Sequence, residues 1–90
     1  MNDMEIQNLR DLFEDWRRIL CGLPEIMKVN TPKLEHYMAF EIETAHTIND
    51  EPTFVTMVIN TGKSYNQVCK DVLRFATRCF VRFNKVLPTL

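Results

Sequence analysis

The sequence predicts an α+β domain in the order helix–strand–strand–helix, with both helices packed on one face of an antiparallel hairpin. Two observations predict this class. Apolar residues recur at spacings of three and four near both ends of the chain, and they alternate with polar residues in its middle. The 90 residues are enough for one small domain, over residues 1–90, and a hydrophobic fraction of 46% is ordinary for a globular protein.

The first predicted element is a helix over residues 3–21. Asn2 or Asp3 can accept hydrogen bonds from the first free N–H groups of this helix. At the other end, Gly22 can adopt the left-handed conformation of a C-terminal cap, and Pro24 prevents continuation. The apolar stripe that predicts burial of one helix face comprises Ile6, Leu9, Phe13, Trp16 and Leu20.

The middle of the chain predicts two strands. Residues 22–33 form a connection, with room for a short extra strand at 26–29. Residues 34–46 alternate between apolar and polar side chains, which is typical of a strand with one face in the core and one in water. A turn over residues 46–52 leads to a second strand at 53–60, so the two strands most simply form an antiparallel hairpin.

The last predicted element is a long helix over residues 64–86, between the N-cap residue Ser64 and the helix-breaking Pro88. Its apolar arc spans roughly 160° on a helical wheel, which is more than one helix needs to lie against one sheet face. The repeat at the centre of this arc comprises Tyr65, Cys69, Val72, Ala76, Cys79, Phe83 and Val86.

The predicted elements carry more apolar surface than they can cover. A two-stranded sheet is marginally stable alone, its edges are open, and the second strand is apolar on both faces. We therefore expect a partner chain to extend the sheet, in a homodimer or a heteromeric complex. The predicted function is that of a non-catalytic protein–protein interaction subunit acting through strand 53–59 and helix 64–86. The predicted interface comprises Phe54, Val55, Met57, Val58, Ile59, Phe75 and Val81.

Charge is unevenly distributed along the chain. Residues 1–60 hold 11 acidic and 5 basic side chains, whereas residues 61–90 hold 1 acidic and 6 basic ones. Most of the basic residues in the second segment form a stripe along the last helix. This stripe is either solvated, or paired with an acidic partner or with the acidic N-terminal half of the chain, or a track for phosphates. The last reading gives the alternative function, a small nucleic-acid-binding module. The basic stripe comprises Lys70, Arg74, Arg78, Arg82 and Lys85.

The sequence predicts no enzyme activity, no cofactor and no metal site. The segment 60–65, Asn-Thr-Gly-Lys-Ser-Tyr, has the end of a phosphate-binding loop, but Met57 stands where that motif needs its first glycine. His36 and His46 lie roughly 33 Å apart along a straight strand and cannot share one metal ion. Glu41 and Glu43 are a pair of carboxylates on one strand face, which is typical of a solvated surface.

The cysteine pattern predicts a reducing compartment. Cys21, Cys69 and Cys79 are odd in number and widely spaced, so they do not form a disulfide framework. The acidic N-terminus lacks the features of a signal peptide, and no apolar run approaches the ~18 residues that span a bilayer. We therefore expect an intracellular protein, cytoplasmic or nuclear, without a membrane partner.

The order of the elements resembles that of the small subunits of the signal recognition particle Alu domain, which are α-β-β-β-α and pair to bind RNA. The resemblance covers element order alone, because the predicted order has one strand fewer and no motif of this chain carries it. It implies a paired subunit with RNA as a partner.

Overall fold

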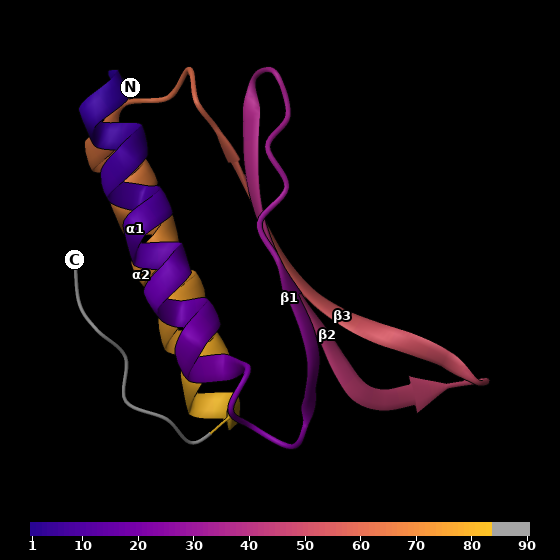
Figure 1. The fold of residues 1–90 in the computed structure, drawn as a ribbon. Coiled ribbons are helices and arrows are strands. Elements are labelled where there is room, and N and C mark those ends of the chain that lie inside the picture. The colour runs from indigo at the N-terminus through magenta and orange to yellow at the C-terminus, as the bar shows by residue number, and fades with distance from the viewer. Residues whose placement is uncertain (84–90) are drawn as a thin grey trace.

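The computed structural model describes the backbone of residues 1–83 and the side chains of residues 1–79. It has two layers, a helical layer and an antiparallel sheet in the order β1-β2-β3 (Figure 1). The elements along the chain are α1 (Asp3–Leu20), β1 (Ile26–Asn30), β2 (Tyr37–Ile48), β3 (Glu51–Asn60) and α2 (Tyr65–Phe83).

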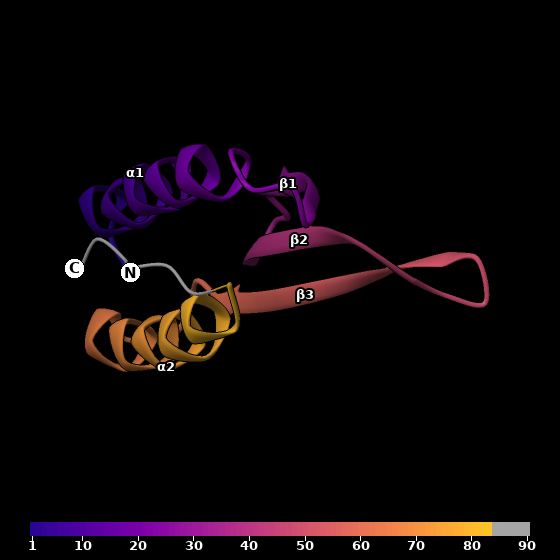
Figure 2. The same ribbon diagram turned by 90° about the horizontal axis from the view of Figure 1, so that it is seen from below.

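The predicted α+β class is confirmed, and both helices lie on the same side of the sheet, α1 towards β1 and α2 towards β3 (Figure 2). The sheet has three strands, because the segment that the sequence marked as an optional short strand pairs with β2 as β1. Ile26 and Val29 of β1 both reach the core, although they are three residues apart, because a register shift lies between Ile26 and Lys28.

The first helix begins with a reciprocal cap. The Asn2 side chain accepts a hydrogen bond from the Glu5 N–H at 2.8 Å, and the Glu5 carboxylate accepts one from the Asn2 N–H at 2.9 Å. The predicted left-handed cap at Gly22 is wrong, because neither described glycine has a positive φ. The chain instead leaves the helix through a tight turn in which the Leu23 N–H donates to the Leu20 carbonyl at 3.0 Å.

The second helix begins as predicted and runs to the end of the described backbone. The Gln67 N–H donates to the Ser64 hydroxyl at 3.3 Å, so Ser64 is the N-cap. Residues 84–86 of the predicted helix lie outside the described residues. The core-facing side of α2 comprises Val68, Val72, Phe75, Ala76 and Cys79.

Phe40 of β2 is the centre of the core. Its side chain is 0% exposed, and its ring lies 5.3 Å from the ring of Phe13 and 5.8 Å from that of Trp16, both on α1. On the other side, the ring of Phe75 on α2 lies 6.1 Å away in an edge-on arrangement. One residue of the sheet thus joins both helices to the same face.

The hairpin of β2 and β3 extends well beyond the helical layer (Figure 2). Asn49 and Asp50 form its tip with φ values of 53° and 64°, the left-handed pair that a two-residue hairpin turn requires. A register shift between Glu43 and Thr47 separates this arm from the regular part of the sheet. The regular part, over Phe54–Asn60 of β3, is the region that packs on the helices.

We predict that Phe40→Ala lowers the free energy of unfolding by about 3–5 kcal/mol, because it leaves a cavity between the two helices and the sheet. Phe54→Ala is the matched control, since Phe54 is 53% exposed on the opposite face of the sheet. Its expected cost is below about 1 kcal/mol. Urea denaturation followed by circular dichroism measures both values, and equal losses in the two variants would contradict this description of the core.

Candidate interaction surface

The outer face of the sheet is uncovered by either helix. Phe54 is 53% exposed and Val58 is 61% exposed, whereas the alternate residues of β3 turn inward to the core. Tyr37 of β2 is exposed on the same outer face, since its neighbour Met38 is buried on the inner one. We call Tyr37, Phe54 and Val58 the outer patch.

The edge of β3 presents unpaired backbone groups beside this patch. The Thr61 N–H donates to the His36 carbonyl at 3.0 Å, and hydrogen-bonded residues alternate along an antiparallel strand. Every second residue of β3 before Thr61 therefore bonds β2, and the intervening ones direct their N–H and C=O groups to the open edge. The edge-directed residues are Phe54, Thr56 and Val58, with Asn60 at the strand end.

The two edges of the sheet differ in how they resist pairing with another chain. The β1 edge is 5 residues long, has a register shift after Ile26 and carries Lys28. The β3 edge is 10 residues long and carries no charged side chain from Pro52 to Asn60. Edge strands usually carry charges, bulges or internal prolines that prevent pairing, so β3 is the edge that the fold leaves open.

A cleft runs along the β3 edge, between β3 and α2. It comprises two adjoining cavities of about 230 and 200 Å³ that share Thr56, Phe75 and Arg78. We call this the edge cleft. Its lining residues are Val55, Thr56, Met57, Val58, Asp71, Arg74, Phe75, Arg78 and Cys79.

Charge in the edge cleft is predominantly positive. Asp71 lies between two cations, with its carboxylate 3.8 Å from Lys63 Nζ and 4.0 Å from a guanidinium nitrogen of Arg74. The second guanidinium, that of Arg78, lines both cavities. The cleft therefore offers cationic side chains above an apolar floor formed by the buried ring of Phe75.

The structure divides the predicted interface residues into two groups. Phe54 and Val58 are exposed, and Val55 is half-buried at the edge cleft. Met57, Ile59 and Phe75 are buried in the chain's own core and not on its surface, because the inner face of β3 and the facing side of α2 cover each other. The side chain of Val81 lies outside the described residues.

The members of the basic stripe also differ in where the structure places them. Lys70, Arg74 and Arg78 are exposed on α2, but of these only Arg74 and Arg78 line the edge cleft. The side chains of Arg82 and Lys85 lie outside the described residues. The sequence indicated the stripe by basic residues four positions apart. That spacing alone could not show that Arg74 and Arg78 lie beside the open edge of β3.

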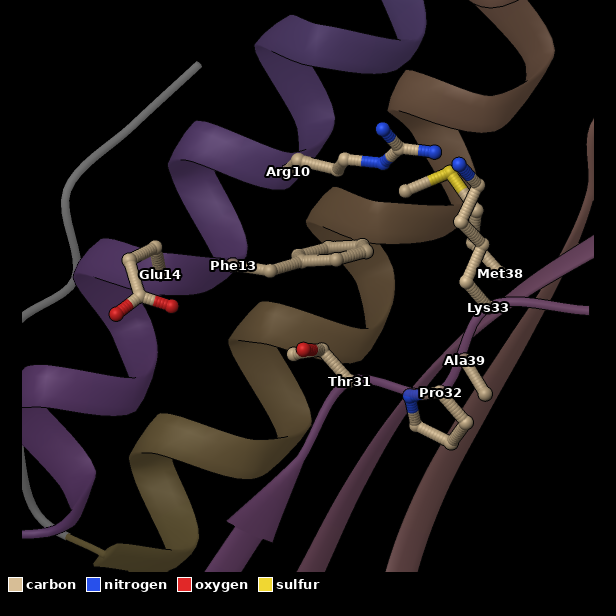
Figure 3. A pocket seen from close by; sticks show the side chains of 8 residues that line it. All are labelled: Arg10, Phe13, Glu14, Thr31, Pro32, Lys33, Met38 and Ala39. Carbon is tan, nitrogen blue, oxygen red and sulfur yellow. The ribbon is translucent and has the colours of Figure 1, made fainter.

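A separate cavity of about 350 Å³ lies between α1 and the segment before β2 (Figure 3). The Phe13 ring lines it, the side chains of Arg10 and Lys33 converge near Met38, and Glu14 points away from them. A hydrogen bond from Arg17 lowers the pKa of Glu14, so this carboxylate stays ionised.

Among the described residues, no group of three or more histidine, cysteine or acidic side chains is arranged to hold a metal ion. Neither described helix is long and apolar enough to cross a membrane. Comparison with protein-family models, with curated proteins and with solved structures gives no match for this chain.

We predict an alternating pattern of amide hydrogen exchange along β3 in the dilute, isolated chain. The N–H groups of Val55, Met57 and Ile59 bond β2 and should exchange at least about tenfold more slowly than those of Thr56 and Val58, which face the open edge. Exchange resolved by residue in NMR spectra measures this. Equal protection at all five amides at low concentration would show that the edge of β3 is not open.

Proposed function

We propose that this protein is a non-catalytic interaction subunit that binds a protein partner through the β3 edge and the outer patch. One observation carries the proposal: Phe54, Thr56 and Val58 combine free backbone groups at an uncharged strand edge with side chains on an uncovered sheet face. A partner strand that pairs there satisfies the backbone groups and covers the apolar side chains in one step.

The energetics support a specific contact at this place. Each backbone hydrogen bond to a partner strand contributes about 0.5–1.5 kcal/mol net, and burial of apolar surface adds about 25 cal/mol per Å². Phe54 and Val58 lie on either side of Thr56 on the same face, so a partner strand can contact both. The partner is a second copy of the chain or a different protein.

The proposal includes an intracellular location. Cys21 is exposed, Cys69 is half-buried and Cys79 is buried, and none of the three forms a disulfide. Free thiols persist in reducing compartments, and an exposed one such as Cys21 is at risk of oxidation elsewhere.

Nucleic-acid binding along the basic stripe is the second candidate, favoured by the exposure of Lys70, Arg74 and Arg78 on one side of α2. Lys70, Arg74 and Arg78 can neutralise at most three phosphates, so the affinity that they provide is low and falls steeply with salt. We expect a labelled RNA or DNA oligonucleotide to bind only at low salt. By contrast, assembly through the outer patch should persist or tighten as salt rises.

The proposed function is tested by charged substitutions in the outer patch of the full chain, expressed with a tag in its native cells. We predict that Val58→Asp and Phe54→Asp move the chain, 10.7 kDa without its tag, from a defined assembly to a free monomer in sedimentation. A charge at either site opposes burial of the side chain against a partner. It changes the free energy of unfolding of the free chain little, because both side chains are exposed there.

Leu73→Asp is the matched control, because Leu73 is 48% exposed on α2 and lines neither part of the edge cleft. It should leave the assembly unchanged, and circular dichroism should show that all three variants are folded. A folded Val58→Asp variant in an unaltered assembly, or a wild-type chain that sediments alone at every concentration and in every extract, would contradict the proposed function.

A further inference from the structure

We infer that the occupant of the β3 edge is an extended strand of a different protein, with acidic side chains directed at α2 and apolar side chains on the outer face. This inference rests on the proposed function and adds the chemistry of the partner. It follows from the register of β3, from the charge of the edge cleft and from the consequence of pairing β3 with itself.

The register of β3 sets which partner side chains lie on which face. Within the strand, Phe54, Thr56 and Val58 direct backbone groups to the edge, so the partner residues opposite them form the hydrogen bonds. The side chains of those partner residues lie on the outer face, beside the outer patch. The intervening partner residues, opposite Val55 and Met57, direct their side chains to the inner face and hence into the edge cleft.

The side chains that enter the edge cleft meet two guanidinium groups. Arg74 and Arg78 line it together with Val58 and Thr56, so both cations lie along the strand that a partner would join. Lys63 and Arg74 already flank the single carboxylate of the cleft, Asp71. Aspartate or glutamate side chains from the partner would complete this charge balance, and guanidinium groups bind carboxylates in a forked geometry.

A second copy of the chain fits the backbone but not the charge. A two-fold axis at Thr56 would place Phe54 opposite Val58 of the second copy, which is a favourable apolar pair. The same axis would bring Arg74 and Arg78 of both copies towards one cleft. The two Asp71 carboxylates offset half of these four cations, and from Pro52 to Asn60 β3 offers no acidic side chain to offset the rest. The partner strand therefore comes from a protein that supplies the carboxylates.

The inference is tested with the full chain and labelled heptapeptides of alternating residues. We predict that a valine–glutamate peptide binds at least about tenfold more tightly than the corresponding valine–lysine peptide in fluorescence anisotropy at low salt. Arg78→Glu should reverse this preference. Lys70→Glu makes the same change of charge on the same helix but outside the edge cleft, and it should leave the preference as in the wild type.

A second variant separates strand pairing from attraction of charge alone. Thr56→Pro removes an N–H that points to the edge and not to β2, so the chain stays folded while binding of the valine–glutamate peptide falls at least about tenfold. Thr56→Val keeps the N–H and should bind like the wild type. Unchanged binding by a folded Thr56→Pro variant would overturn the inference.

Three further outcomes overturn the inference, and the first two distinguish it from the proposed function. If neither peptide binds while Val58→Asp still disrupts the native assembly, the proposed function stands and the acidic strand is wrong. If the purified wild-type chain dimerises and Thr56→Pro abolishes the dimer, the occupant is a second copy. Equal binding of both peptides would show that the arginines do not select the partner.

Discussion

The packing of both helices on one face of the sheet, around Phe40, is the constraint on which the rest of the structure depends. Phe13 and Trp16 of α1 and Phe75 of α2 meet the same buried ring, so neither helix can cover the other face. In 90 residues no further element is described that could do so. The exposed outer patch is thus a direct consequence of how a small chain forms one core.

The position of α2 decides what the open edge can recognise. A helix beside an edge strand lends its side chains to any chain that joins that edge, and here those side chains include Arg74 and Arg78. In the proposed complex, the backbone of β3 provides the attraction common to all strands, whereas the two arginines distinguish acidic from basic partners. Affinity and selectivity then arise from different elements, which lie side by side only in the folded chain.

Much of the fold could be predicted from the sequence, because α1, α2 and β2 have clear periodicities. The sequence allows β1 as a short extra strand but does not require it, because the register shift after Ile26 breaks the alternation by which a strand is identified. For β3, both sets of alternate residues are apolar, so pattern alone could not show that Met57 and Ile59 turn to the core while Phe54 and Val58 remain exposed. Phe75 was assigned to a partner for a related reason, because the side of α2 that meets Phe40 is set by tertiary packing.

The most direct measurement is amide hydrogen exchange along β3 in the native assembly, compared with the free chain. Entry of a partner strand at the edge should slow exchange at Phe54, Thr56 and Val58, because these N–H groups gain acceptors, and should leave Val55 and Met57 nearly unchanged. Protection that appears on α1 or at the hairpin tip, with the amides of β3 unaffected, would contradict a partner joined at this edge.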